Sequence, residues 1–349
     1  MGHGEELLVV LLACACGCGG KSVAVSSGGN PGSSSGAEVD QGATAVTLAS
    51  GQNRPVGIAI DDTSVYWVNG GTYARADGSV MKVSLGGGTA TTLAEGQVGL
   101  GHVVVDSSNV YWTSGTSGGG QGPGSTGAVA SVPLGGGAPP TTLVSGPFAP
   151  AGIAVDSTHV YWANADPEYP NGTVLAVPLG GGALTTLASG QDGPFALAVD
   201  ATSVYWTDNG GAVMQAPLGG GAATTLVSGQ GPTGIGIAVD ATDVYWTVKG
   251  PTVMAVPLAG GTVTTLVSAS GQYAYGMAVD AANVYWTNFG DGTVMKVPLG
   301  GGAATTLVSG QDSPVGVAVD ATSVYWANYG CQSDGGVCTS GSIMKMTPK

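Results

Sequence analysis

Histidine is the scarcest of the side chains that could do acid–base chemistry in this 349-residue sequence. The three histidines are His3, His102 and His159. His102 begins a short aliphatic stretch, and the related stretches elsewhere in the chain carry Gly or Ala at its position. The spacing gives no reason to bring a serine or an aspartate to His102, so a Ser-His-Asp arrangement is not predicted. The remaining catalytic interpretation is a divalent metal held by His102 and loop carboxylates, for which the candidates are Asp166, Asp192 and Asp208.

The N-terminal cysteines indicate lipidation. Residues 7–13 are apolar, and the segment Leu11-Leu12-Ala13-Cys14 resembles a bacterial lipobox, in which the cysteine carries the lipid. Cys14 is therefore the predicted lipidation site, with Cys16 or Cys18 as the alternative. An ordinary cleaved signal peptide is a second interpretation. A cytosolic metal-binding cluster is a third, which the spacing C-x-C-x-C disfavours because it lacks the usual paired C-x2-C arrangement.

The segments after the leader fit an exported protein. We expect residues 1–18 to be a signal or lipobox-like leader and residues 19–42 to be a flexible Gly/Ser-rich tether, with a span of roughly 25–30 Å. Cys331 and Cys338 lie seven positions apart in one polar, Gly-rich loop. They are predicted to form a disulfide, which requires an oxidising compartment. The predicted location is outside the cytoplasm, in the bacterial periplasm, at the outer membrane or on the cell surface.

A repeat of about 40 to 50 residues organises the rest of the chain. Each of the seven tryptophans is preceded by Val-Tyr: Trp67, Trp112, Trp162, Trp206, Trp246, Trp286 and Trp326. The unit is clearest from Gly276 to Gly310, where it reads GMAVD, AANVYWTN, GTVMKVPLGGG and AATTLVSG. These are four short β-branched or aromatic runs bounded by turn residues. Four strands per unit without a helical period predict an all-β, seven-bladed β-propeller over residues 43–349.

The two ends of the repeat predict how the ring closes. The segment from Gly42 to Gln52 matches the fourth run of the other units, and the last unit ends after its third run, GSIMKMTPK. Pairing of residues 44–49 with residues 343–347 would complete the seventh blade and cover both strand edges.

Two recurrent motifs are interpreted as turns rather than as sites. An aspartate ends each first strand, where its carboxylate can accept a backbone N–H: Asp61, Asp106, Asp156, Asp200, Asp240, Asp280 and Asp320. The LGGG or LAGG runs supply positive-φ positions for hairpins. No Lys-Ser/Thr follows these runs, which argues against phosphate binding. The tyrosine and tryptophan of each Val-Tyr-Trp motif are predicted to pack between blades.

One unit contains the tetrapeptide Tyr205-Trp206-Thr207-Asp208. With the aliphatic-Asp before it and V-M-x-x-x-L-G-G after it, this unit resembles the YWTD repeat of low-density-lipoprotein-receptor-type (class B) β-propellers. The resemblance covers roughly residues 43–349 and implies an extracellular binding module without catalysis. It departs from the family in having seven units instead of six and in placing the motif aspartate only at Asp208. The chain also looks like uncharacterised propeller lipoproteins of bacteria.

Composition limits the partners. The formal net charge is -14 and only 9% of the residues are charged, so the basic surface that nucleic acid requires is absent. No apolar run reaches the roughly 18 residues of a membrane-spanning helix, so we expect contact with a membrane only through a lipid anchor. No cofactor is predicted, and the protein is expected to be a monomer.

The aromatic residues outside the repeat motif indicate where a ligand would bind. All of them fall in loops that join second to third strands or one blade to the next, and these loops emerge on one face of a propeller, here called the loop face: Tyr73, Phe148, Tyr169, Phe195, Tyr273, Tyr275, Phe289 and Tyr329. Together with Arg75 and His102 they are the predicted ligand-binding residues, suited to stacking on sugars or covering apolar groups. The alternative is that some of them plug the central channel. Gln52, Gln311 and equivalent glutamines recur in the same loops and are predicted to tie loops together.

The sequence thus predicts a non-catalytic binding module for a glycan, a cell-wall fragment or a protein. The first alternative is a metal-dependent propeller enzyme of the lyase or lactonase kind that uses His102 and loop carboxylates. The second is a purely structural surface protein.

Overall fold

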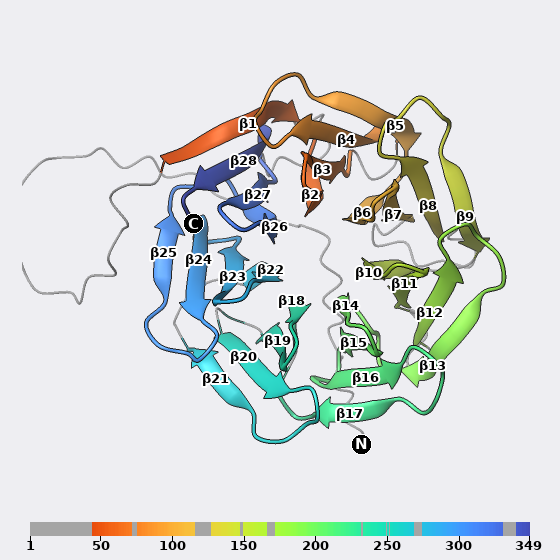
Figure 1. The fold of residues 1–349 in the computed structure, drawn as a ribbon, viewed down its shortest axis with the longest axis vertical. Coiled ribbons are helices and arrows are strands. Elements are labelled where there is room, and N and C mark those ends of the chain that lie inside the picture. Colours follow the sequence, from red (N-terminus) through yellow and green to blue (C-terminus); the bar gives the residue numbers. More distant parts are fainter. Residues whose placement is uncertain are drawn as a thin grey trace, which may run out of the picture.

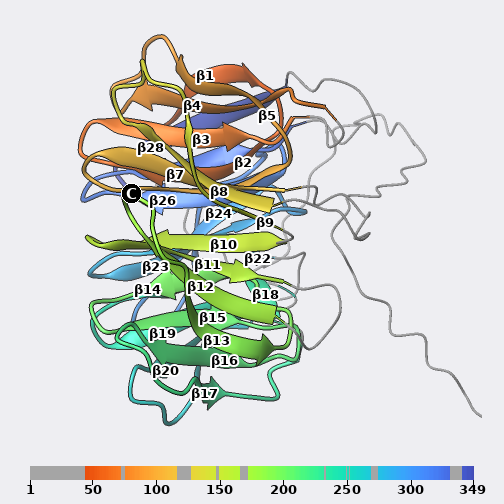
Figure 2. The same cartoon turned by 90° about the vertical axis from the view of Figure 1, so that its right-hand side faces the viewer.

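The computed structural model describes residues 44–71, 75–115, 127–146, 149–165, 172–231, 233–248, 250, 252–268, 274–330 and 340–349. Their strands form seven four-stranded antiparallel sheets arranged as blades around a central axis (Figure 1). Seen edge-on, the strands run across the thickness of a disc (Figure 2). The predicted seven-bladed propeller is therefore confirmed.

Each blade runs from an inner strand beside the axis to an outer strand at the rim (Figure 1). The inner strands are β2 (Pro55–Ile60), β6 (Leu100–Val105), β10 (Pro150–Val155), β14 (Leu197–Val199), β18 (Thr233–Val239), β22 (Ala274–Val279) and β26 (Pro314–Val319). The second strands are β3 (Ser64–Asn69), β7 (Asn109–Ser114), β11 (His159–Asn164), β15 (Ser203–Thr207), β19 (Asp243–Val248), β23 (Asn283–Asn288) and β27 (Val324–Asn328).

The two outer layers complete the blades. The third strands are β4 (Gly78–Ser84), β8 (Gly127–Pro133), β12 (Gly172–Pro178), β16 (Val213–Pro217), β20 (Thr252–Pro257), β24 (Thr293–Pro298) and β28 (Gly341–Thr347). The fourth strands are β5 (Thr91–Gln97), β9 (Thr141–Gly146), β13 (Thr185–Gln191), β17 (Thr224–Val227), β21 (Thr264–Val267), β25 (Thr305–Val308) and β1 (Thr44–Gln52).

The ring closes through β1. This strand pairs antiparallel with β28, in the register Thr44↔Thr347 through Ala49↔Ile343. The sheet order β1-β28-β27-β26 therefore joins one N-terminal strand to three C-terminal ones, as the sequence predicts. The inner strands β2 and β26 also contact each other, so the first and last blades are neighbours at the axis as well.

The Val-Tyr-Trp motif joins consecutive blades. Neighbouring residues of a strand point to opposite faces of the sheet, so the tyrosine and the tryptophan of one motif face different blades. In each of the seven core clusters, the tyrosine of one blade packs with the tryptophan of the next, for example Tyr111 with Trp162 and, across the closure, Tyr325 with Trp67. All seven tryptophans are at most 1% exposed. The predicted packing between blades is confirmed.

Glycine in the inner strands permits close approach of the next blade. A Cβ on Gly276 would lie 2.3 Å from the carbonyl oxygen of Val315, and a Cβ on Gly152 would lie 2.5 Å from that of Phe195. Real Cβ atoms do not come this close to other heavy atoms, so the backbone of one inner strand occupies the place of a side chain on its neighbour. Gly57, Gly236 and Gly316 hold the same position in other blades.

The aspartate turns are as predicted, with one addition. In all seven, one carboxylate oxygen accepts backbone N–H groups of the turn, and the other accepts the hydroxyl of the motif tyrosine five residues later; the tyrosine donors are Tyr66, Tyr111, Tyr161, Tyr205, Tyr245, Tyr285 and Tyr325. These aspartates are structural. Within the described ranges, no helix is long and apolar enough to cross a membrane.

Candidate functional site

Six of the ten predicted ligand-binding residues are described: Arg75, His102, Phe195, Tyr275, Phe289 and Tyr329. Tyr73, Phe148, Tyr169 and Tyr273 lie outside the described residues, as do Asp166 and the predicted disulfide partners Cys331 and Cys338. The predicted leader and tether, with Cys14, Cys16 and Cys18, also lie outside them. The site is therefore built from the six described residues and their neighbours.

Three aromatic residues of the loop face form one cluster, here called the aromatic cluster: Tyr275, Phe289 and Tyr329. The ring centroids of Tyr275 and Phe289 are 5.8 Å apart with planes inclined at 32°, and those of Phe289 and Tyr329 are 6.4 Å apart in an edge-to-face arrangement. Tyr275 and Phe289 are half-buried, whereas Tyr329 is 8% exposed. Tyr329 is thus the buried member of the cluster, while Tyr275 and Phe289 keep accessible surface.

The positions of these residues in the repeat explain why they meet. Phe289 and Tyr329 each follow the last residue of a second strand, β23 and β27, in consecutive blades. Tyr275 lies at the start of the inner strand β22, directly before the closely packed Gly276. The tight contact between β22 and β26 brings the two blades close enough for the three rings to touch. The apolar side chains of Val56 and Val315 belong to the same core cluster.

His102 and Phe195 form a second contact on the loop side. Their ring centroids are 6.4 Å apart and the planes are nearly perpendicular, at 84°. The two residues come from blades that are not consecutive, because the blade of β10 lies between β6 and β14 (Figure 1). Gly152 of β10, in the intervening blade, packs against the backbone beside Phe195: its N–H donates to the carbonyl of Phe195 at 2.8 Å, and a Cβ on it would lie 2.5 Å from that oxygen.

The surroundings of the His102 imidazole favour its neutral form. Burial lowers its pKa, and a hydrogen bond with the backbone of Ala151 acts in the opposite direction. Its Nδ1 is buried and has no hydrogen-bond partner among the described residues. A neutral imidazole with an unused nitrogen can ligate a metal or accept a proton, provided that other groups converge on it.

Asp192 and Asp208 are the described carboxylates that were predicted to hold a metal together with His102, and their arrangement differs from that prediction. A Cβ on Gly210 would lie 2.5 Å from Asp192 Oδ2 and 3.4 Å from Asp208 Oδ1, so both carboxylates border the same glycine. Asp208 is 6% exposed and accepts the N–H of Ala212 at 2.8 Å, which makes it a turn cap. Burial, and secondarily the charge of Asp192, raises the pKa of Asp208. In the part of the chain that the structure describes, no three His, Cys, Asp or Glu residues lie close enough together to hold a metal ion.

The sequence reasoning missed the role of the threonine that follows the motif tryptophan. Thr113 Oγ1 accepts the N–H of His102 at 3.1 Å and donates to the carbonyl of Ala151 in the next blade at 3.3 Å. Thr287 makes the same two contacts, with Gly276 and Val315. Thr207 and Thr247 accept the corresponding N–H groups in their own blades. Its recurrence in four of the seven motifs was the signal that it fixes the inner strands beside the site.

The predicted role of the loop glutamines is confirmed for two of them. Gln52 Oε1 accepts the indole N–H of Trp67 at 2.9 Å and the amide of Asn69 at 3.0 Å. Gln311 makes the same pair of contacts, with Trp326 and Asn328, at 3.0 and 3.1 Å. These glutamines tie the loop between blades to the core of the next blade.

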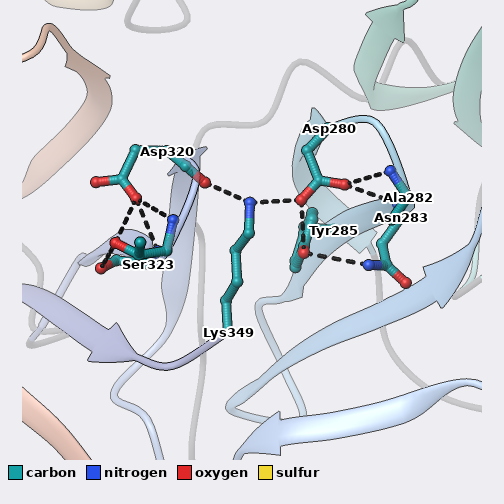
Figure 3. A network of polar contacts seen from close by, with 8 residues as sticks. Asp280, Ala282, Asn283, Tyr285, Asp320, Ser323 and Lys349 are labelled. Carbon is teal, nitrogen blue, oxygen red and sulfur yellow. Dashed lines mark hydrogen bonds and ion pairs between the residues drawn. The ribbon is translucent and has the colours of Figure 1, made fainter.

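The opposite face holds a network that was not predicted. The ammonium of Lys349 forms an ion pair with Asp280, donates to the carbonyl of Asp320, and lies 5.4 Å from the centroid of the Tyr285 ring (Figure 3). These residues border an open depression of about 920 Å³ between the blades of β22 and β26. Lys349 belongs to the blade of β26 and Asp280 to the blade of β22, so their ion pair connects these two blades.

Comparisons with known proteins identify the fold and no closer relationship. No protein-family profile matches the sequence, and no curated protein matches it. Among solved structures, the chain resembles a streptogramin B lyase with a TM-score of 0.66 and 11% identity, over 88% of this chain and 97% of that one. It also resembles the computationally designed protein Ika8 with a TM-score of 0.58 and 17% identity, over 87% and 98% of the two chains.

A nidogen/laminin complex matches at a TM-score of 0.48 and 19% identity, over 62% of this chain and 90% of that one. The fold is that of a seven-bladed β-propeller. At these identities the likeness concerns the fold alone.

Proposed function

We propose that this propeller is a non-catalytic binding module whose ligand, a glycan, a cell-wall fragment or a protein, contacts the loop face at the aromatic cluster. The observation that carries the proposal is the half-buried state of Tyr275 and Phe289, whose rings touch each other at a centroid distance of 5.8 Å. Rings held in fixed positions lose little conformational freedom on binding and bury much area, which is why aromatic residues dominate binding hot spots.

The surroundings of the cluster support a preformed site. Tyr329 is buried and contacts Phe289 edge to face, and its backbone N–H donates to the carbonyl of Ser313 at 3.0 Å. Thr287 fixes the contact between β22 and β26. A ligand would therefore meet a surface that needs little rearrangement, so less of the interaction energy is spent on ordering it.

A glycan array with the purified propeller tests this proposal. The matched variants are Tyr275→Ala and Phe289→Ala at the cluster and, as a control on the opposite face, the exposed Asp62→Asn. We expect a ligand whose binding both aromatic variants weaken at least tenfold and the control leaves unchanged. Tyr273→Ala extends the test to a candidate outside the described residues. A ligand bound equally well by Tyr275→Ala and Phe289→Ala would contradict a site at the cluster.

A lyase-type or lactonase-type enzyme is the second candidate, and His102 is the observation that favours it. Its surroundings favour the neutral imidazole and its Nδ1 has no partner among the described residues, as a metal ligand requires before binding. The likeness to a streptogramin B lyase is compatible with this reading. Metal analysis of purified protein followed by His102→Ala distinguishes the candidates: stoichiometric metal that is lost with the substitution, together with a lost activity, would favour the enzyme.

We further propose that the protein is exported and attached to a membrane through a lipid on Cys14, or on Cys16 or Cys18. The cysteine-containing segment after the apolar residues 7–13 supports this proposal. Metabolic labelling with a fatty acid in cells that express Cys14→Ala, Cys16→Ala or Cys18→Ala would identify the site, since label should be lost in one variant only. Absence of label in the parent protein would overturn the anchor, and label that persists in all three variants would refute these three sites.

A further inference from the structure

The loops around the aromatic cluster carry two exposed carboxylates. Asp291 follows Phe289 by two residues in the loop between β23 and β24, and Asp312 lies in the connection from β25 to β26. The two loops are joined, because the N–H of Gln311 donates to the carbonyl of Gly292 at 2.9 Å. The carbonyl of Asp312 in turn accepts the N–H of Gly330, the residue after Tyr329, at 3.3 Å. Both aspartates therefore lie in loops that adjoin the residues carrying the rings.

The charge of the loop face is negative as a whole. Its described carboxylates are Asp77, Asp192, Asp208, Asp291 and Asp312, and its described cations are Arg54 and Arg75. Arg54 is 7% exposed, and its guanidinium donates to the carbonyl of Gly71 at 3.4 Å, so it is held within its own loop. The sequence carries a formal net charge of -14. A ligand that approaches this face meets an attractive field only if it is positively charged.

We propose that the aromatic cluster, with Asp291 and Asp312 beside it, recognises an organic cation, namely an alkylammonium group. This inference rests on the proposed function, because it uses the same surface, and it adds the chemical class of the group bound. The faces of aromatic rings are electron-rich and attract a cation placed over them. Carboxylates at the edge of the same surface add a Coulombic attraction.

A neutral or anionic group fits this surface less well. An anion would be repelled by both carboxylates and would find no exposed cation among the residues of the cluster. A neutral sugar would stack on the rings without using the charges. An alkylammonium group uses both features, since its methyl or methylene groups cover the rings while its positive charge faces Asp291 and Asp312.

Calorimetric titration with choline tests the inference on the full-length protein. The reference ligand is the uncharged carbon isostere of choline, in which a tert-butyl group replaces the trimethylammonium group, so the two probes have the same shape and differ in charge. We expect choline to bind at least about tenfold more tightly than the isostere, and added salt to weaken it.

Three variants locate the site. Phe289→Leu keeps an apolar side chain but removes the ring, and Asp312→Asn removes a charge from an exposed position without changing its shape. Each should weaken choline roughly two- to fivefold. Asp62→Asn, also exposed but on the opposite face, should have no effect. Equal binding of choline and its isostere, or choline binding that Phe289→Leu and Asp312→Asn leave unchanged, would overturn the inference.

The two proposals can fail separately. A glycan bound through Tyr275 and Phe289 in a protein that does not bind choline would leave the binding module in place and refute cation recognition. Choline binding that depends on Phe289 and Asp312, with no glycan bound, would support cation recognition and refute the glycan ligand class. Absence of both would refute the glycan ligand class and cation recognition.

Discussion

Tyr66 donates its phenolic hydrogen to Asp61 Oδ2 at 2.7 Å, while Oδ1 of the same carboxylate accepts the N–H of Thr63 and of Ser64 at 2.7 and 2.8 Å. The pair therefore connects the inner strand, the turn and the second strand of a blade. The same contact is present in all seven blades, so a propeller with few charged residues repeats one charge-assisted hydrogen bond around the ring.

This relationship predicts that the protein loses stability in alkali. Burial, followed by the hydrogen bond to the aspartate, raises the pKa of Tyr66, Tyr111, Tyr205 and Tyr325 to about 12. A pKa that is raised in the folded state contributes stability below the unfolded value of about 10 and loses it as the pH rises through the folded value. The free energy of unfolding should therefore fall between about pH 10 and pH 12. Tyrosinate absorbance and denaturant titrations across this range measure it.

Tyr66→Phe tests one pair directly. Because Asp61 loses a charge-assisted bond and keeps its two N–H donors, we expect a loss of about 1.5 kcal/mol at neutral pH. The tyrosinate signal near pH 12 should decrease by one residue. If the variant were as stable as the parent protein, the tyrosine would contribute by packing alone.

Much of the fold could be predicted from the sequence because its elements are repeated. The blade number, the closure of β1 on β28 and the aspartate turns all follow from spacing. The tyrosine contact was missed, although its constant distance of five residues from Asp61 or Asp106 would have indicated it. The aspartates could be assigned to turns from the residues around them. The hydrogen bond from the tyrosine hydroxyl depends on the register between two strands.

The candidate site was predictable only in part. The order of the strands placed Phe289 and Tyr329 on the loop face. Their contact is explained by their equivalent positions in consecutive blades. The approach of His102 to Phe195 was not predictable, because it spans an intervening blade, whose Gly152 packs closely against the backbone of Phe195. Which loop residues meet is decided by the distance between inner strands, and a repeat pattern does not contain that distance.

Alanine in place of Gly276 should destabilise the ring. Its Cβ would lie 2.3 Å from the carbonyl oxygen of Val315, and relief of that clash would separate β22 from β26. Overpacking of this kind costs about 1–3 kcal/mol. Gly300→Ala in the same blade is the matched control, since nothing lies within 4 Å of its Cβ and its φ is not positive. Thermal unfolding of the two variants compares them; equal melting temperatures would refute the close-approach explanation.

Deletion of residues 43–50 should destabilise the whole domain and not only one blade. β1 supplies the fourth strand of its sheet, and Leu48 is 8% exposed in a cluster that also contains Trp67 and Tyr325. Without β1, the edge of β28 is uncovered and the contact between first and last blades weakens. Hydrogen exchange should therefore rise in blades on both sides of the closure. A truncated protein with an unchanged melting temperature would contradict closure through β1.

Lys349→Met should weaken the connection between the blades of β22 and β26 on the face opposite the aromatic cluster. Burial alone would raise the pKa of Asp280; the hydrogen bonds from Lys349, from the turn N–H groups and from Tyr285 outweigh it and lower the pKa to about 2. A lowered carboxylate pKa contributes stability above the unfolded value of about 3.9 and loses it as the pH falls toward 2.

Methionine keeps an unbranched apolar side chain and removes the charge, so the variant should lose roughly 1 kcal/mol at neutral pH, an amount suited to a partly exposed pair. The difference from the parent protein should shrink as the pH approaches 2, where Asp280 is protonated in both. Lys296→Met, in the third strand of the β22 blade, serves as a control for loss of a positive charge as such. Denaturant titrations at neutral and acidic pH make the comparison. A difference that does not change with pH would mean that Lys349 acts through the Tyr285 ring or the carbonyl of Asp320 and not through Asp280.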